Sequence, residues 1–360
     1  MKYHFSHRRR CHITGGMLLL LCCVVLSSCS STAQSSAAST ANTDIATSYS
    51  TDLFAMDTVM TLTAYGTNAQ TAVETSAEEI QRLEKIFSTN LEDSAIAQLN
   101  AHKTAQLPED AITVLQTALQ LYDDTEGAFN VALYPIVKAW GFTTENYRIP
   151  SSEELAALLR HTDVNSLIVN SGIAQLSDSA AEIDLGGIVK GYTSDQVMQI
   201  MAQQNIQSAV ISLGGNVQTL GTKPDGSLWR VGIQDPDNPD ECICLVEVAD
   251  KAVITSGPYQ RYFIGEDGVR YHHIINPQTG APAESGLASV TIVSDSGILA
   301  DGLSTSLFVM GPEQALQYWQ EHRQNFDAIL ITTDRQIIIT AGLSDCFQSD
   351  SDYYVFGEQS

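Results

Sequence analysis

Two segments more than a hundred residues apart carry polar side chains at spacings that suit phosphate chemistry. The first, EIDLGGIVKGYTSDQVM (182–198), predicts a strand over 181–185, then a glycine turn and a helix over 187–204. Asp184 closes the expected strand, and Lys190 lies one turn into the helix. Glycine turns that lead into helices can cradle phosphates, which bind both backbone N–H groups and a cation. The glycines alone could equally serve a structural turn.

The second segment, ADGLSTSLFVMG (300–311), places Asp301 and Thr305 four residues apart in an expected helix. Residues at this spacing are neighbours on one helix face, with Cβ atoms about 5–6 Å apart. A carboxylate and a hydroxyl so placed can both reach a hard cation such as Mg²⁺. The alternative is that Asp301 complements the helix dipole and Thr305 packs in the core.

Three further stretches hold polar residues that a plain core does not need: SLGGN (212–216), SGPYQRYF (256–263) and YHHIINPQTG (271–280). His272 and His273 are successive strand residues that face opposite ways, so at most one can point into a given site. Together, the five stretches supply oxygen ligands, positive charge and glycine-lined backbone, which a diphosphate and its metal require. We therefore expect an obligatory divalent metal.

The elements that must position these residues indicate an α+β fold. The alternating pattern over 52–66 predicts an opening strand, and apolar spacing predicts helices over 69–89 and 108–127. From residue 165 the chain is dominated by short strands, followed by a strand and helix around 288–311 and a closing hairpin over 327–340. Strands and helices do not alternate strictly, which argues against a doubly wound sheet.

The N-terminus predicts export and membrane attachment. A basic start (MKYHFSHRRR) precedes the apolar run MLLLLCCVVL and the sequence LSSC, which ends at Cys29. This pattern predicts a lipoprotein signal peptide over 1–28, with Cys29 lipidated as the mature N-terminus; an uncleaved anchor is the alternative. Residues 29–50 are rich in Ser, Thr and Ala and predict a flexible tether. The folded domain is expected over 51–355, at the extracytoplasmic face of the cell membrane.

Composition narrows the range of partners. The formal net charge is −24 and the isoelectric point is near 4.4, which disfavours nucleic acid as a ligand. Cys242 and Cys244 alternate along an expected strand, on one face, without a zinc-binding spacing nearby. Buried free thiols are expected, with a bridge from one of them to Cys346 as the alternative.

In combination, the motifs resemble the ApbE-type FAD:protein FMN transferases over about residues 52–340. They include MDT, GAFNVALYPIVKAWGF, DLGGIVKGY, SLGGN, TSGPYQRYF, HHIINPQTG and SVTIVSDSGILADGLSTSLFVMG. The resemblance implies one T-fold-related domain with an antiparallel sheet and flanking helices. It also implies a Mg²⁺-dependent transfer of the FMN moiety of FAD to a Thr or Ser hydroxyl, with release of AMP. The implied acceptor is a subunit of a membrane redox complex or an extracellular flavoprotein with a Ser/Thr motif.

The resemblance also assigns residues to roles. Mg²⁺ would be held by Asp301, Thr305 and the backbone carbonyl of Gly187. His273 would help to deprotonate the acceptor hydroxyl, and Asp301 would be catalytic through the metal. The residues implied to contact FAD are Met56, Ala128, Phe129, Asn130, Asp184, Lys190 and Ile275.

Four positions depart from the family pattern, and none is an expected metal ligand. Asp57 replaces the more usual Gly, Asn90 stands where a Tyr often stacks on flavin, and Asn130 and Asn276 each replace a common Asp. The same residues leave two other functions open: an FAD pyrophosphatase that releases FMN and AMP, and a non-catalytic flavin-binding lipoprotein. All three functions require 184–190 and 301–305 to meet at one cavity.

Overall fold

The computed structural model describes residues 7–9 and 47–357. Cys29 lies outside these residues, as do most of the expected signal peptide (1–28) and tether (29–50). The expected catalytic domain over 51–355 falls within them.

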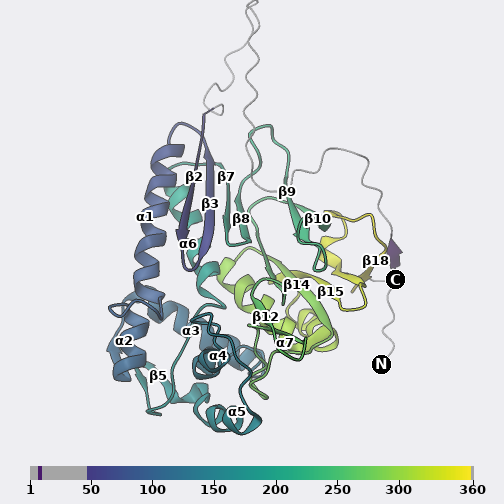
Figure 1. Cartoon of the computed structure of the whole chain (residues 1–360). Helices are drawn as coiled ribbons and strands as arrows, with labels where there is room; N and C mark the ends of the chain where they lie inside the picture. The colour runs from purple at the N-terminus through teal and green to yellow at the C-terminus, as the bar shows by residue number, and fades with distance from the viewer. Residues whose placement is uncertain (1–6, 10–46, 358–360) are drawn as a thin grey trace, which may run out of the picture.

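A ten-stranded sheet forms the centre of the described part of the chain (Figure 1). Neighbouring strands pair antiparallel, except that β16 and β18 pair in parallel. The sheet therefore matches the mainly antiparallel arrangement expected from the sequence. Its strand order is β1 (His7–Arg9), β18 (Tyr353–Phe356), β16 (Ile337–Thr340), β15 (Phe326–Thr332), β14 (Leu287–Ser294), β11 (Ala252–Ser256), β8 (Asn216–Leu220), β7 (Ser208–Leu213), β3 (Thr58–Tyr65) and β2 (Ser48–Ala55).

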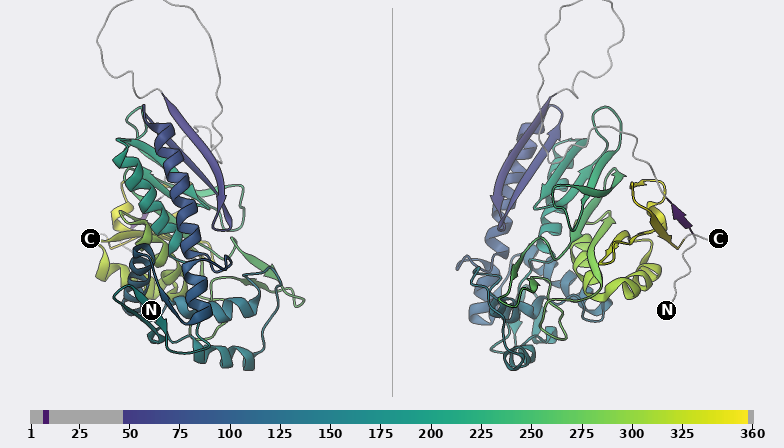
Figure 2. Two further views of the ribbon diagram at one scale, coloured as in Figure 1. Left: turned by 90° about the vertical axis from the view of Figure 1, so that its left-hand side faces the viewer. Right: turned by 45° about the vertical axis from the view of Figure 1, so that its right-hand side comes forward.

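Helices cover one face of this sheet, and a small second sheet covers part of the other. Helices α1 (Ala69–Phe87) and α6 (Val189–Gln203) pack on β3 and β7, and α7 (Gly297–His322) packs on β11 and β14. Figure 2 shows α1 running alongside the β2–β3 hairpin. The second sheet consists of β17 (Phe347–Gln348), β10 (Cys242–Val248) and β9 (Trp229–Gln234).

A largely helical region lies beyond the end of the sheet, below it in Figure 1. It contains α2 (Ala95–His102), α3 (Glu109–Asp124), α4 (Tyr134–Trp140) and α5 (Ser152–Leu158). A three-stranded sheet of β4 (Thr104–Gln106), β6 (Ile173–Leu176) and β5 (Leu167–Asn170) joins these helices. Nearby, β12 (Tyr262–Ile264) and β13 (Arg270–His272) form a separate hairpin.

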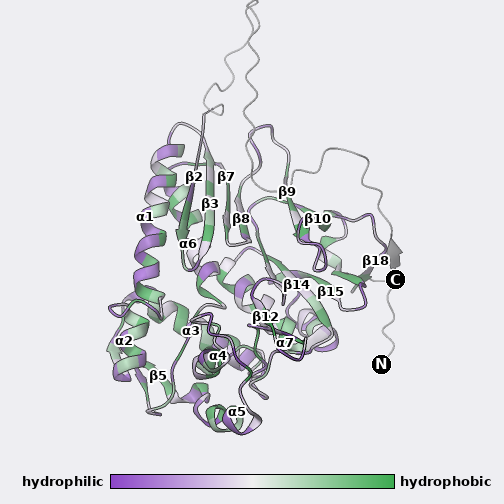
Figure 3. Cartoon of the chain, viewed as in Figure 1, coloured by the Kyte–Doolittle hydropathy of each residue, from purple (hydrophilic) through white to green (hydrophobic). Residues whose placement is uncertain are grey.

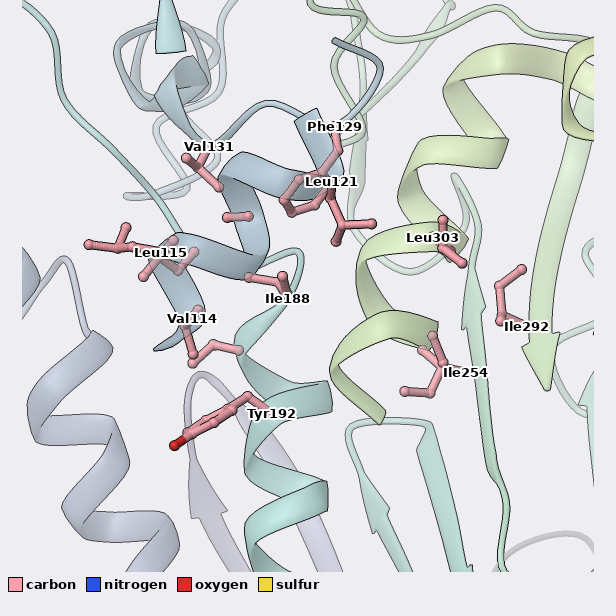
Figure 4. Close-up of a cluster of buried hydrophobic side chains, with 14 of the residues drawn as sticks. Val114, Leu115, Leu121, Phe129, Val131, Ile188, Tyr192, Ile254, Ile292 and Leu303 are labelled. Atoms are coloured by element: carbon pink, nitrogen blue, oxygen red, sulfur yellow. The ribbon is translucent and has the colours of Figure 1, made fainter. Parts of the chain in front are cut away.

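The largest apolar cluster joins the helical region to the sheet. Figure 4 shows Leu121 and Phe129, from α3 and the loop after it, facing Ile188 and Leu303 at the start of α6 and in α7. Figure 3 shows mostly green, apolar residues along the strands of the central sheet, whereas α1 carries both green and purple residues. Burial of apolar area is the main favourable term in folding, so this cluster fixes where α6 and α7 lie.

The expected α+β class is confirmed, but two strand predictions are wrong. Residues 52–66 form two strands, not one: β2 and β3 join at a tight turn in which Met56 and Asp57 have φ of 50° and 59°. No Gly or Pro marks this turn, and the alternating pattern continues through it. Residues 181–185 are not a strand, because the backbone N–H and C=O of Ile183 bind the side-chain amide of Asn100 instead of a neighbouring strand.

The structure also tests the predicted end of one helix and the predicted state of the cysteines. Gly311 has φ of 81° and precedes Pro312, so α7 kinks at the residue where the expected helix around 288–311 ends. All three cysteines of the described residues are free, as expected. The expectation that Cys242 and Cys244 share one face is wrong, since a bulge lies between them and leaves Cys242 exposed while Cys244 is buried.

Helices α6 and α7 approach each other most closely at a pair of glycines. A Cβ added to Gly191 would lie 2.2 Å from the carbonyl oxygen of Gly297 and 2.6 Å from Cβ of Asp301. Real Cβ atoms do not come this close to backbone, so a side chain at Gly191 would push the helices apart.

Gly191→Ala is expected to lower the free energy of unfolding by about 1–3 kcal/mol, because the added methyl overpacks a rigid backbone contact. Gly302→Ala is the matched control in α7. Its Cβ would meet the flexible end of Leu121, at 2.4 Å from Cδ1, and alanine gains about 1 kcal/mol of helix propensity over glycine. Urea denaturation of both variants measures the difference, and equal losses would contradict this account of the helix contact.

Candidate active site

The carboxylate of Asp301 lies at the meeting point of α6, α7 and β8. Its side chain is buried, with the residue only 4% exposed. The backbone N–H of Gly191 donates to Oδ2 at 2.8 Å, and the side-chain amide of Asn216 donates to Oδ1 at 2.9 Å. The segments 184–190 and 301–305 are thus adjacent, as all three functions inferred from the sequence require.

Thr305 and Gly187 extend this contact by one turn of α7. A Cβ built on Gly187 would lie 3.7 Å from Oγ1 of Thr305 and 3.4 Å from the ring of Phe129. The Thr305 hydroxyl is half-buried and lies 3.3 Å from Oγ of Ser256, which in turn is 2.8 Å from Oγ of Ser304. The three expected metal ligands are therefore brought together.

The donor set around Asp301 fits a hard divalent cation. Both hydrogen-bond donors to this buried carboxylate are neutral, and no salt bridge to it is found among the described residues. A buried charge without an ionic partner is costly, so a cation beside Asp301 would stabilise it. The described residues contain no group of three or more His, Cys, Asp or Glu that could hold a metal. Mg²⁺ takes few protein carboxylates and keeps waters and phosphate oxygens, so the carboxylate of Asp301 beside the hydroxyl of Thr305 suits it.

Lys190 and Asp184 lie on either side of the glycine turn before α6. Lys190 Nζ donates to the carbonyl of Gly186 at 3.2 Å, and the N–H of Gly186 donates to Asp184 Oδ1 at 2.7 Å. Burial raises the pKa of Asp184, and Asp57 adds to this effect, whereas the Gly186 N–H, Lys190 and Arg261 oppose it. The site mouth therefore combines two carboxylates with two cations.

The β2–β3 turn closes a small cavity of about 120 Å³ beside this pair. The N–H of Met56 donates to Oε1 of Glu84 at 2.7 Å, which anchors the strained turn to α1. Ligand pockets usually measure about 300–1,000 Å³, so this cavity alone cannot enclose a dinucleotide. Its lining consists of Met56, Asp57, Glu84, Phe87, Ser88, Thr89, Asn90, Asp184, Gly186, Val189 and Lys190.

A larger cavity of about 680 Å³ lies between α3 and the second half of α7. Ala128, Asn130 and Asn276 line it, together with Val309, one turn beyond Thr305. Both polar atoms of the Asn130 side chain are hydrogen-bonded: its amide donates to the carbonyl of Thr162 at 3.0 Å, and its oxygen accepts from the N–H of Ala132 at 2.8 Å. An aspartate here could not donate to Thr162, so the amide serves this loop.

The expected FAD contacts are divided between the two cavities. Met56, Asp184 and Lys190 line the small one, and Ala128 and Asn130 line the large one. Phe129 is buried against Gly187, and Ile275 is buried in a separate apolar cluster; neither residue lines either cavity. Neither described cavity contains all seven residues.

His273 follows β13 and lies near the charged side chains of Arg261 and Lys190. Its Nδ1 lies 3.1 Å from the carbonyl oxygen of Arg261. A carbonyl can only accept, so Nδ1 carries the proton and Nε2 is left as the acceptor. Burial lowers the pKa of His273 to about 4, and the positive charges of Arg261, His272 and Lys190 contribute. His272 points elsewhere, edge-on to Phe308.

Comparison with known proteins identifies the family of this chain. A model of the ApbE family matches residues 56–330, most of the described chain. The chain belongs to the ApbE family. The family indicated by the sequence motifs is thereby confirmed.

Several proteins similar to this chain are named FAD:protein FMN transferase or ApbE. The FAD:protein FMN transferase of Treponema pallidum is 32% identical over 320 residues, which are 82% of this chain and 88% of that protein. The Vibrio cholerae FAD:protein FMN transferase is 34% identical over 253 residues, covering 69% and 75%. The crystal structure of the ApbE protein from Thermotoga maritima aligns with a TM-score of 0.76 at 31% identity, covering 81% of this chain and 96% of that one. The flavin transferase ApbE from Vibrio cholerae gives 0.73 at 27%, covering 86% and 98%.

Sequence reasoning missed several contacts of this ApbE-family site. Glu84 holds the Met56 turn, Ser256 lies beside Thr305, and Asn216 binds Asp301. The SLGGN and SGPYQRYF motifs contain Asn216 and Ser256, so the signal was present, but the partners of these side chains were not predictable.

Among the residues that the structure describes, none of the helices combines the length and the apolar character needed to span a bilayer.

The lowered pKa of His273 makes stability depend on pH. As pH falls below about 6.5, the unfolded chain binds a proton at His273, while the folded protein does not until about pH 4. Wild type should therefore lose more unfolding free energy than His273→Gln between pH 7 and pH 5. Asp184 and His272 titrate in both proteins and cancel in the comparison. Urea denaturation at the two pH values measures this effect, and parallel changes in both proteins would contradict it.

Proposed function

We propose that this protein is a Mg²⁺-dependent flavin transferase that moves the FMN moiety of FAD to a Thr or Ser hydroxyl of an acceptor protein and releases AMP. The observation that carries the proposal is the buried Asp301 carboxylate, held by neutral donors next to the segment that bears Lys190. The names of the relatives, FAD:protein FMN transferase, support the same chemistry.

The metal is proposed to bind Asp301, Thr305 and the carbonyl of Gly187. When bound, Mg²⁺ would neutralise negative charge on the FAD pyrophosphate, which otherwise repels a nucleophile. Lys190 is proposed to contribute a second positive charge to the pyrophosphate. Asp184, which is hydrogen-bonded to the turn that Lys190 also binds, would hold that turn in place.

FAD is proposed to contact Met56, Asp184 and Lys190 through the small cavity and Ala128 and Asn130 through the large one. Phe129 and Ile275 would contribute apolar packing only, since both are buried. Asn130 is also proposed to hold the loop that lines the large cavity, because its side-chain oxygen and nitrogen each bind a backbone group there.

His273 is proposed to accept the proton of the acceptor hydroxyl at Nε2. The hydroxyl oxygen then forms a bond to the FMN phosphorus, the bond from that phosphorus to the AMP oxygen breaks, and AMP leaves. A pKa near 4 makes His273 neutral at pH 7 but a weak base. Lys190 and Arg261 help to lower the pKa of His273. An anion bound between these two cations would therefore raise that pKa toward its ordinary value.

The location and the acceptor are part of the same proposal. Residues 1–28 are proposed to be a lipoprotein signal peptide, with Cys29 lipidated and 29–50 acting as a tether for the catalytic domain over 51–355. The domain would then work at the extracytoplasmic face of the cell membrane. Its proposed acceptor is a subunit of a membrane redox complex or an extracellular flavoprotein with a Ser/Thr motif.

Asp301→Asn is expected to reduce Mg²⁺-dependent flavin transfer by at least about 100-fold, because an amide keeps the shape but loses the charge that binds the metal. Asp295→Asn is the matched control, since Asp295 is exposed, pairs with Lys251 and lies on the turn before α7. The measurement is in-gel flavin fluorescence of membrane proteins from the same cell, incubated with FAD and Mg²⁺.

The same assay separates the proposed transferase from its alternatives. FMN and AMP without a labelled acceptor would indicate FAD hydrolysis, and tight FAD binding without turnover would indicate a flavin-binding lipoprotein. Full activity of Asp301→Asn would contradict the proposed site itself.

A further inference from the structure

The SLGGN motif forms a two-residue turn that the proposed chemistry does not yet use. Gly214 and Gly215 have φ of 62° and 93°, and Leu213 pairs with Asn216 across the turn. Two successive residues with positive φ favour glycine and give the tight turn that joins antiparallel strands. A Cβ on Gly214 would also lie 2.5 Å from Oγ1 of Thr58. The turn thereby fixes Asn216 as the first residue of β8.

Asn216 is buried, with 4% exposure, and its amide reaches from the sheet to Oδ1 of Asp301. The other carboxylate oxygen accepts from Gly191 on α6. The plane of the carboxylate is thus held from two sides by groups on two different elements. An ionised carboxylate has about four lone-pair positions, so two remain free for a cation.

We propose that Asn216 is a positioning residue that orients Asp301 for a divalent metal. The inference rests on the proposed function, because it concerns the metal ligand of that site. A neutral amide suits this role because it donates a hydrogen bond without adding positive charge, so it does not compete with the cation for the carboxylate. A lysine or arginine at this place would satisfy Asp301 as an ion pair and remove its need for a metal.

A purely structural role for Asn216 can be separated from positioning, because β8 offers a close counterpart. Gln218, two residues along, is 5% exposed and donates to Oδ1 of Asp195 at 3.0 Å. Asp195 in turn accepts from the N–H groups of Gly297 and Ile298 at the start of α7. Gln218 therefore helps to anchor α7 to the sheet without touching Asp301. Loss of either amide should cost stability, but only loss of Asn216 should affect the metal.

The test measures Mn²⁺ binding by electron paramagnetic resonance in the absence of FAD, with Mn²⁺ as the probe for the Mg²⁺ site. Asn216→Leu keeps the branched shape of the side chain and removes the donor, and is expected to raise the Mn²⁺ Kd by about 10- to 100-fold. Gln218→Met, the matched control, should change it by less than about 2-fold. The Mg²⁺ concentration that gives half-maximal flavin transfer should shift in parallel, while the KM for FAD at saturating Mg²⁺ stays unchanged.

Two further steps keep the test decisive. Asn216→Ser, whose hydroxyl is too short to reach Asp301, replaces Asn216→Leu if the protein with the apolar side chain does not fold. Circular dichroism checks that each variant is folded. Unchanged Mn²⁺ affinity in the Asn216 variants, or equal weakening in Gln218→Met, would overturn the inference even if flavin transfer occurs. If the Asn216 variants bind Mn²⁺ more weakly but the wild-type protein itself transfers no flavin, the result would support the inference and count against the proposed function.

Discussion

The close contact between α6 and α7 is the constraint on which the rest of the site depends. Two glycines, Gly191 and Gly297, let the helix backbones meet, and only at this separation can the N–H of Gly191 reach the carboxylate of Asp301. The apolar cluster around Leu121, Ile188 and Leu303 holds the helices there from the other side. Packing and chemistry are therefore coupled: the same approach that excludes water from the helix interface also buries a charge that has no ionic partner among the described residues.

Much of this arrangement could be predicted from the sequence because it depends on local spacing. Asp301 and Thr305 are four residues apart in a helix, which places them on one face whatever the rest of the chain does. The glycine turn before α6 is likewise encoded locally. The meeting of these two segments is a tertiary contact, and no pattern in either one determines it. It could be inferred only from the combination of motifs, through their resemblance to a family to which the chain does belong.

One strand prediction failed because a side chain replaced the expected backbone partner, and another because a turn lacks a sequence signal. Ile183 looks like a strand residue, but the amide of Asn100, 83 residues earlier, takes both of its backbone hydrogen bonds. The turn at Met56 and Asp57 has positive φ without a glycine, so its sequence carries no turn signal. The residues expected to contact FAD are divided between two cavities, and this division is a tertiary feature that spacing along the chain cannot reveal.

The turn at Asp57 has a consequence for how the protein meets a charged ligand. Asp57 and Asp184 bring two negative charges to a mouth where Lys190 and Arg261 bring two positive ones, and His273 stays uncharged near neutral pH. Glu84 lines the same cavity, so the entrance has no excess of positive charge, on a chain whose overall charge is −24. Long-range attraction can then contribute little to the capture of an anion. Recognition instead depends on short-range contacts made after arrival, which dissolved salt screens far less.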